Sequence, residues 1–172
     1  MIGVVVWLTG LPGAGKTTIA ALVVARLRTA GHRVEHLDGD VLRAKLGETG
    51  FSRLERESFL ERVGAMASQF EAEGAVVVAS FVSPYRASRG AIRSQCRRFL
   101  EVFVATPLAE CERRDPKGLY ARARRGEILH FTGIDDPYEP PTDPELTIDT
   151  RTVPPAGAAD LILARADLAP IR

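Results

Sequence analysis

The chain carries the stretch Gly10-Leu11-Pro12-Gly13-Ala14-Gly15-Lys16-Thr17-Thr18, which fits the pattern G-x-x-x-x-G-K-[ST] and directly follows the apolar residues 4–8. A glycine-rich loop between a buried strand and a helix is typical of a nucleotide-phosphate site. Its glycines let backbone N–H groups face phosphate oxygens, Lys16 adds a positive charge, and the Thr17 hydroxyl can bind Mg²⁺. The alternative is a glycine-rich turn with a chance lysine. We favour the phosphate site, because residues 17–27 after the loop have the required helical pattern.

The composition indicates one globular domain. A chain of 172 residues is long enough for one well-buried core and short for two, so residues 1–172 are predicted to form a single domain. The 23 Lys and Arg residues against 22 Asp and Glu residues give a net charge of +1, which argues against a dedicated nucleic-acid or membrane-surface binder.

The cysteines and the N-terminal residues carry expectations about the compartment. Cys96 and Cys111 lack the spacing of a metal or redox motif, and reduced structural thiols are expected rather than a disulfide or a metal site. The first strand is predicted from about Val4, with no basic region or long apolar segment before it. We therefore expect a cytoplasmic protein.

Apolar segments alternate with helical ones along the chain. Residues 4–8 form an unbroken apolar run, which suits a central parallel strand covered on both faces. Further strands are predicted at residues 33–37, 75–81, 99–105 and 146–149. The expected fold is α/β: a P-loop NTPase-type, doubly wound parallel sheet of about five strands, with helices on both faces.

Two carboxylates follow the second predicted strand, in Asp38-Gly39-Asp40. Because strand side chains alternate, Asp38 and Asp40 are expected to project to the same side, beside the phosphate loop. Paired carboxylates there can hold Mg²⁺ and accept a proton from an attacking hydroxyl. Asp38 could instead only cap the next helix, whereas we favour a functional role for Asp40. The third predicted strand ends without a carboxylate, which leaves this pair as the best-placed acids.

Phe51 and Arg56 flank the start of a predicted helix. Ser52 and Glu55 form a capping box there, and Arg56 occupies the position where an apolar partner would close a staple on Phe51. Phe51 is therefore free to stack on a flat group such as a nucleobase. Arg56 shares a helix face with core residues and needs an anionic partner, either a protein carboxylate or a substrate.

A basic segment at residues 113–125 and a proline-rich stretch at residues 137–144 predict a mobile lid over phosphates, at about residues 114–144. The alternatives are a solvated helix face and a nucleic-acid patch, and the nearly neutral overall charge disfavours the patch.

Together these motifs resemble the adenylylsulfate kinases (APS kinases), which phosphorylate the 3′-hydroxyl of adenosine 5′-phosphosulfate (APS) with MgATP. The resemblance covers about residues 4–150. It rests on residues 10–18, 37–40 with Arg43, 50–52 with Arg56, 81–86, 114–120 and 131–139.

The resemblance implies a role for each matched residue. ATP would be held by the phosphate loop, with Arg114 over the base; the loop residues are Gly10, Gly13, Ala14, Gly15, Lys16, Thr17 and Thr18. Thr17 and Asp38 would hold Mg²⁺. The catalytic candidates are Lys16, Asp40 facing the 3′-hydroxyl, and Ser83. The acceptor site would comprise Asp38, Asp40, Arg43, Phe51, Arg56, Val82, Ser83, Lys117 and Phe131. In that set, Arg43, Arg56 and Lys117 would receive the phosphosulfate, and the two phenylalanines would sandwich the adenine.

Three positions need separate comment. Val41 and Phe59 stand where the family commonly has Asn, so acceptor affinity or identity could differ, although Phe59 also fits the core stripe of its helix. Ser83 matches a serine sometimes labelled a phosphoenzyme intermediate, but residues 81–86 offer no adjacent base, and we favour a lining role.

The implied reaction is ATP + APS giving ADP + PAPS, and the resemblance implies a homodimer. A P-loop kinase for another small hydroxylated acceptor and a nucleotide-dependent switch are the alternatives. The absence of an Asn-Lys-x-Asp guanine motif from the sequence disfavours the switch.

Overall fold

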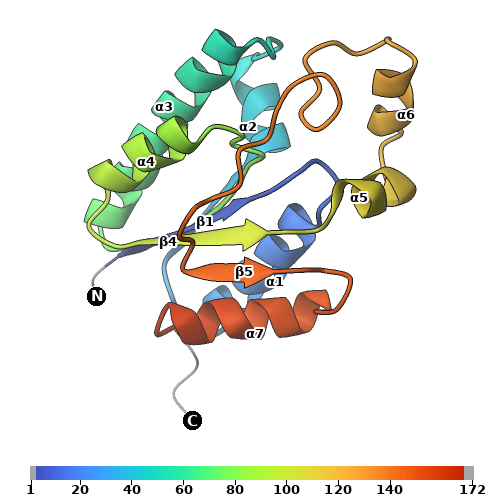
Figure 1. Cartoon of the computed structure of the whole chain (residues 1–172). Helices are drawn as coiled ribbons and strands as arrows, with labels where there is room; N and C mark the ends of the chain where they lie inside the picture. Colours follow the sequence, from blue (N-terminus) through green and yellow to red (C-terminus); the bar gives the residue numbers. More distant parts are fainter. Residues whose placement is uncertain (1–2, 169–172) are drawn as a thin grey trace.

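A single parallel sheet organises the computed structural model, which describes residues 3–168. The ends of the predicted domain, residues 1–2 and 169–172, lie outside the described residues. The sheet has five strands in the order β2-β3-β1-β4-β5 (Figure 1). These strands are β1 (Val4–Thr9), β2 (Val34–Asp38), β3 (Val76–Ser80), β4 (Phe99–Val104) and β5 (Leu146–Ile148). The predicted five-stranded parallel sheet is confirmed.

Helices cover both faces of the sheet (Figure 1). Alternate residues of β1 enter two separate cores: Val4, Val6 and Leu8 pack with α1 and α7, while Val5 and Trp7 pack with α3 and α4. This two-sided burial explains why β1 is apolar at nearly every position. The helices are α1 (Lys16–Thr29), α2 (Gly39–Leu46), α3 (Arg53–Ala72), α4 (Arg86–Gln95), α5 (Leu108–Arg114), α6 (Leu119–Arg124) and α7 (Pro155–Arg165).

The connection from β2 to α2 differs from the prediction. Asp38 is the last residue of β2, and α2 begins at Gly39 without an intervening loop. The Asp38 side chain accepts the backbone N–H groups of Asp40 at 3.1 Å and Val41 at 3.3 Å, and so caps the helix. The expectation that Asp38 and Asp40 alternate along one strand is therefore wrong, because Asp40 lies in the first helical turn.

Other boundaries moved by a few residues. The strands predicted to end at residues 81 and 149 end at Ser80 in β3 and at Ile148 in β5. The capping box of Ser52 and Glu55 is confirmed. Cys96 and Cys111 are both free thiols, as expected.

The predicted lid segment lies beyond the carboxyl ends of the strands. It contains α6 and a series of turns, and it returns beside the sheet to β5 (Figure 1). The Tyr138 hydroxyl, near the end of this segment, lies 2.9 Å from Thr9 Oγ1 at the end of β1. Within residues 3–168, no helix has the length and apolar character needed to cross a membrane.

The packing of α3 on α4 can be tested by substitutions at two glycines. A Cβ at Gly64 would lie 2.7 Å from Cγ1 of Ile92, whereas a Cβ at Gly90 of α4 would meet nothing within 4 Å. Because Ile92 is buried and cannot yield freely, Gly64→Ala should lower the free energy of unfolding by about 1–3 kcal/mol. The matched change Gly90→Ala should leave stability unchanged or raise it by up to about 1 kcal/mol, since alanine favours the helix. Urea denaturation of both variants measures this, and equal stabilities would contradict the packing.

Candidate active site

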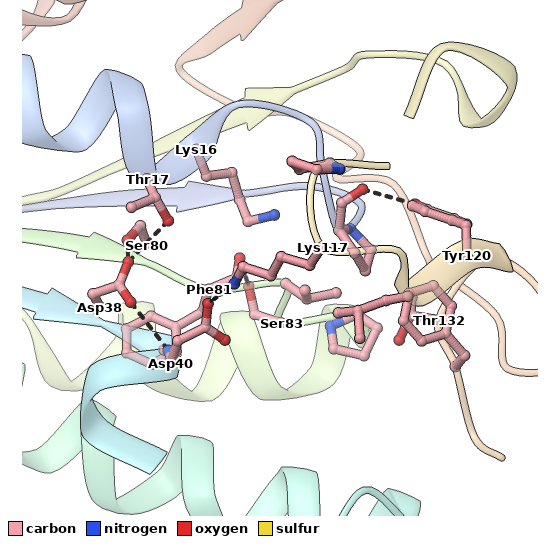
Figure 2. Close-up of a pocket in the computed structure, with 18 of the residues that line it drawn as sticks. Lys16, Thr17, Asp38, Asp40, Ser80, Phe81, Ser83, Lys117, Tyr120 and Thr132 are labelled. Atoms are coloured by element: carbon pink, nitrogen blue, oxygen red, sulfur yellow. Dashed lines mark hydrogen bonds and ion pairs between the residues drawn. The ribbon is translucent and has the colours of Figure 1, made fainter. Parts of the chain in front are cut away.

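A cavity of about 950 Å³ opens at the carboxyl ends of the strands (Figure 2). It is lined by the phosphate loop, the start of α2, the first half of α3, the β3–α4 connection and the lid. Every residue assigned to the site from the sequence lines it except two, Gly10 and Ala14. Gly10 lies against β4, where a Cβ would come within 2.5 Å of the Val104 carbonyl oxygen, and Ala14 is fully buried.

The glycines and the lysine of the phosphate loop determine its conformation. Gly13 and Gly15 have φ values of 74° and 107°, which favour glycine. Lys16 is buried, and its Nζ donates to the carbonyl oxygens of Gly10 at 2.9 Å and Leu11 at 2.7 Å. Burial lowers the pKa of Lys16 to about 8. The loop thus presents a desolvated cation at the N-terminus of α1, which is an arrangement that attracts anions.

Asp38 connects the loop to the sheet. Its Oδ2 accepts hydrogen bonds from Thr17 Oγ1 and Ser80 Oγ, both at 2.9 Å, while Oδ1 accepts the helix N–H groups described above (Figure 2). Burial raises the pKa of Asp38, but these hydrogen bonds outweigh burial, and the net pKa lies below its ordinary value. Asp38 therefore both caps α2 and orients the Thr17 hydroxyl. The sequence interpretation missed Ser80, whose only signal was its place at the end of β3.

The oxygen atoms around Thr17 are compatible with Mg²⁺. Because Thr17 donates its proton to Asp38, its lone pairs remain free, and magnesium prefers oxygen ligands. Both oxygens of Asp38 already accept two hydrogen bonds each. Within the described part of the chain, no cluster of three or more His, Cys, Asp or Glu side chains could hold a metal. The residues present thus suit a magnesium ion that takes most of its ligands from phosphates and water.

Arg43 lies between two aromatic rings on the opposite wall of the cavity. Its guanidinium carbon is 4.6 Å from the ring centroid of Phe51 and 4.4 Å from that of Phe59. Its Nη1 donates to the Gly50 carbonyl oxygen at 3.0 Å. Burial, and then the like charge of Arg56, lower the pKa of Arg43. The rings fix this guanidinium in place and shield it from water.

Arg56 pairs with no protein carboxylate among residues 3–168, and an anionic substrate as its partner stays a prediction. It is buried, and it donates to two backbone carbonyl oxygens: Nε to Phe51 at 2.7 Å and Nη2 to His130 in the lid. Among residues 3–168, neither Arg56 nor Arg43 takes part in a salt bridge. The two guanidiniums form a positively charged wall that no carboxylate of the described residues contacts directly.

Two phenylalanines reach the cavity from different segments. Phe51 is half exposed between α2 and α3, whereas Phe131 in the lid is buried with its ring edge-on to Tyr120, at 4.9 Å between centroids. The Tyr120 hydroxyl donates to the Pro12 carbonyl oxygen of the phosphate loop at 2.7 Å (Figure 2). Tyr120 therefore ties the lid to the loop, a contact that the sequence did not reveal.

Lys117 and Asp40 form an ion pair across the mouth of the cavity (Figure 2). Both side chains are mostly exposed. At the other side of the phosphate loop, Arg114 donates to Thr150 Oγ1 and to Glu110, both at 2.7 Å. The lid thus contributes Arg114 and Lys117 to the lining of the cavity, together with Arg122.

Ser83 is buried in a hydrogen-bonded chain. Its Oγ accepts the indole N–H of Trp7 at 3.0 Å and donates to Thr9 Oγ1 at 3.0 Å. No carboxylate lies within hydrogen-bond distance of Ser83 Oγ among the described residues, and Asp40 is paired with Lys117. A base that would activate this serine is therefore missing from its surroundings.

Comparison with known proteins shows the family of this chain. The family model described as "Adenylylsulphate kinase" matches residues 2–149. The chain belongs to the adenylylsulfate kinase family. An adenylyl-sulfate kinase of Synechococcus sp. (strain JA-3-3Ab) is 49% identical over 162 residues, covering 94% of this chain and 92% of the relative. The predicted family, P-loop fold and kinase class are confirmed.

Two solved structures of the family extend the comparison. The APS kinase of Mycobacterium tuberculosis, solved in complex with AMPPNP and APS, superposes with a TM-score of 0.92 at 40% identity, covering 96% of this chain and 98% of that one. A hexameric APS kinase from Thiobacillus denitrificans gives a TM-score of 0.74 at 32% identity, with 96% of this chain and 29% of that chain covered.

The two departures from the adenylylsulfate kinase pattern have different structural settings. Phe59 is 1% exposed and supports both Arg43 and the ring of Phe81, whose centroid lies 6.1 Å away. Phe59, at a position where the family commonly has Asn, is therefore a packing change. Its ring also stacks against Arg43. Val41 is half exposed on α2 and does not line the cavity.

The buried lysine of the loop predicts a pH effect on stability. Because the pKa of Lys16 is about 8 in the folded protein and 10.5 ordinarily, the unfolded chain holds this proton over a range where the folded chain has released it. The free energy of unfolding should therefore rise with pH between about 8 and 10.5 through this residue. Urea denaturation in this range should show a shallower rise for Lys16→Met. Lys45→Met, at an exposed position, is the control, and parallel profiles for wild type and Lys16→Met would refute the pKa shift.

Proposed function

We propose that this protein transfers the γ-phosphoryl group of ATP to the 3′-hydroxyl of APS, giving ADP and PAPS. The observation that carries the proposal is the juxtaposition, in one cavity, of a phosphate loop with the arginine wall around Phe51. A phosphate loop explains the donor, and a desolvated pair of guanidiniums beside a half-exposed aromatic ring suits an acceptor with an anionic group and a base. Family membership adds support for APS as that acceptor.

On the donor side, the phosphates of ATP bind the backbone of Gly13, Gly15 and Thr18, with Lys16 as their counter-charge. Anions that reach Lys16 replace the two carbonyl oxygens to which it now donates. Arg114 lies over the base. Thr17 would hold Mg²⁺, and Asp38 would orient Thr17 through their hydrogen bond. When bound, Mg²⁺ neutralises charge on the phosphates.

On the acceptor side, Arg43 and Lys117 bind the phosphosulfate, and Phe51 and Phe131 contact the adenine. Arg56 adds charge to the same wall while it holds the backbone of Phe51 and His130 in place. Val82 lines the cavity beside the acceptor.

Asp40 accepts the proton of the 3′-hydroxyl as that oxygen attacks the γ-phosphoryl group. For this it leaves Lys117, which then pairs with the anionic acceptor instead. The hydroxyl attacks directly, in line with the leaving oxygen, so that catalysis consists of positioning and charge neutralisation. Ser83 is a wall of the acceptor site and not a nucleophile, in keeping with its hydrogen bonds to Trp7 and Thr9.

The wider organisation is also part of the proposal. Residues 1–172 act as one kinase domain with a lid at about residues 114–144, in the cytoplasm. The protein works as a homodimer, although one structural relative is described as hexameric. A kinase for another small hydroxylated acceptor is the competing function, because Val41 and Phe59 replace Asn at positions near the acceptor in the family pattern.

An acceptor screen tests the proposed function. With MgATP, ADP release should be fast with APS and close to background with AMP, shikimate or gluconate, because only APS offers a base together with the phosphosulfate. Coupled detection of ADP and identification of PAPS by mass spectrometry provide the measurement. Preferential turnover of any of the other three acceptors would replace the proposal with the competing function.

Asp40→Asn tests the base. The variant keeps the shape of the side chain but loses its basicity, so kcat should fall by at least ~10²-fold. Thermal melting should be nearly unchanged, since the Asp40 side chain is mostly exposed. Asp160→Asn, at an exposed position on α7, is the control and should retain wild-type turnover. Near-normal turnover by Asp40→Asn would remove this residue from the proton transfer.

A further inference from the structure

The buried guanidinium of Arg89 joins three segments that lie far apart in the sequence. Arg89 belongs to α4 and is 2% exposed. Its Nε donates to Glu101 Oε1 of β4 at 2.8 Å, its Nη1 to the Ser83 carbonyl oxygen at 2.6 Å, and its Nη2 to the Glu139 carbonyl oxygen at 2.6 Å. The Arg89 side chain thus contacts two segments. One is the β3–α4 connection at Ser83, here called the acceptor wall, and the other is the end of the lid nearest β5, at Glu139, here called the returning end of the lid.

A second arginine of α4, Arg93, belongs to the same group of charged side chains. Glu101 also lies 3.4 Å from Nη2 of Arg93, and Arg93 pairs with Glu145 at 2.6 Å. Glu145 Oε2 in turn accepts the backbone N–H of Glu101 at 2.7 Å. Arg93 therefore shares the ionic network with Arg89, but it makes no hydrogen bond to Ser83 or Glu139.

The returning end of the lid is attached to the acceptor wall at several points. The Glu139 backbone N–H donates to the Pro84 carbonyl oxygen at 2.8 Å, and the Arg86 backbone N–H donates to the Glu139 side chain at 2.8 Å. The adjacent Tyr138 lies with its ring centroid 5.7 Å from the Arg89 guanidinium, and its hydroxyl is bonded to Thr9. The lid and the acceptor wall are therefore positioned as one unit around Arg89.

The backbone of Ser83 requires such support. Its φ of 41° lies in the left-handed region, which is unfavourable for a residue with a side chain. The carbonyl oxygen of Ser83 accepts Nη1 of Arg89, while its Oγ is held by Trp7 and Thr9. These bonds hold a conformation that the local sequence does not favour.

From this geometry we infer that Arg89 is a positioning residue for the acceptor. It acts by holding Ser83 and Glu139 in fixed positions relative to each other. The inference rests on the proposed function for its kinetic consequence. Arg89 does not line the cavity, so it acts through the residues that it holds. Its bidentate donation to two carbonyl oxygens, with a third bond to Glu101, needs a guanidinium, because a lysine ammonium cannot span these three acceptors.

Arg89→Lys is the first test, because it keeps a positive charge opposite Glu101 and loses the planar fork. The KM for APS should rise by at least ~10-fold, while the KM for ATP stays within about twofold, since a small displacement of a binding wall has a large effect on alignment. Arg93→Lys is the matched control: it alters the same ionic network on the same helix and should leave both KM values near those of wild type. An equal rise in the APS KM for both variants, or no rise for Arg89→Lys, would overturn the inference.

Tryptophan fluorescence supplies a readout that needs no catalysis. Trp7 is the only tryptophan in the sequence, and its indole N–H donates to Ser83 Oγ. The emission spectrum should change more in Arg89→Lys than in Arg93→Lys, because of these two arginines only Arg89 donates to Ser83, whereas Arg93 reaches Trp7 only through the ring of Phe99. If wild type fails to phosphorylate APS, the proposed function is wrong, and an unchanged Trp7 spectrum in Arg89→Lys would separately refute the positioning role.

A second variant covers the case in which Arg89→Lys does not fold, which would follow if the shorter reach of the lysine left the buried Glu101 without this partner. In Arg89→Met combined with Glu101→Gln, both charges are removed together, and the fold should be retained. This double variant should show the same selective rise in the APS KM and the same change in Trp7 emission. A folded double variant with wild-type values for both would also overturn the inference.

Discussion

The hydrogen bonds to the Asp38 carboxylate are the interaction on which the site depends. One oxygen accepts the first N–H groups of α2, and the other accepts the hydroxyls of Thr17 on α1 and Ser80 on β3. Three elements thereby meet at one ionised group, whose pKa is held low by the bonds that it accepts. Since α2 carries Asp40 and Arg43, the same carboxylate positions the phosphate loop and these two cavity-lining residues together.

The sheet could be predicted from the sequence because its strands are apolar runs buried on both faces. Residues 4–8 carry this pattern without interruption and residues 75–81 with the single exception of Ser80, and each run leads into a segment that lines the cavity. The start of α2 could not be predicted in the same way. Whether Asp38 ends a strand, caps a helix or does both depends on the N–H groups that follow it, and side-chain alternation along an assumed strand gave the wrong answer for Asp40.

The partners of buried charges were the least predictable part of the site. The sequence indicated correctly that Arg56 faces inward, but its acceptors are backbone carbonyl oxygens, one of them at His130. Any residue can supply a carbonyl oxygen, so no residue type marks such a contact in advance. The same reason conceals the role of Arg89, two of whose three acceptors are carbonyl oxygens. By contrast, the arginine at its staple position indicated that Phe51 has no hydrophobic staple partner, and in the structure its ring stacks with Arg43.

The exposed ion pair of Lys117 and Asp40 makes the protein sensitive to ionic strength in two opposed ways. Salt screens charges that face solvent, so added salt weakens this contact between the lid and α2 and favours an open cavity. The same salt weakens the long-range attraction of an anionic ligand toward Arg43 and Arg56. Added salt therefore loosens one contact between the lid and α2 while it lowers the attraction of the cavity for an anion.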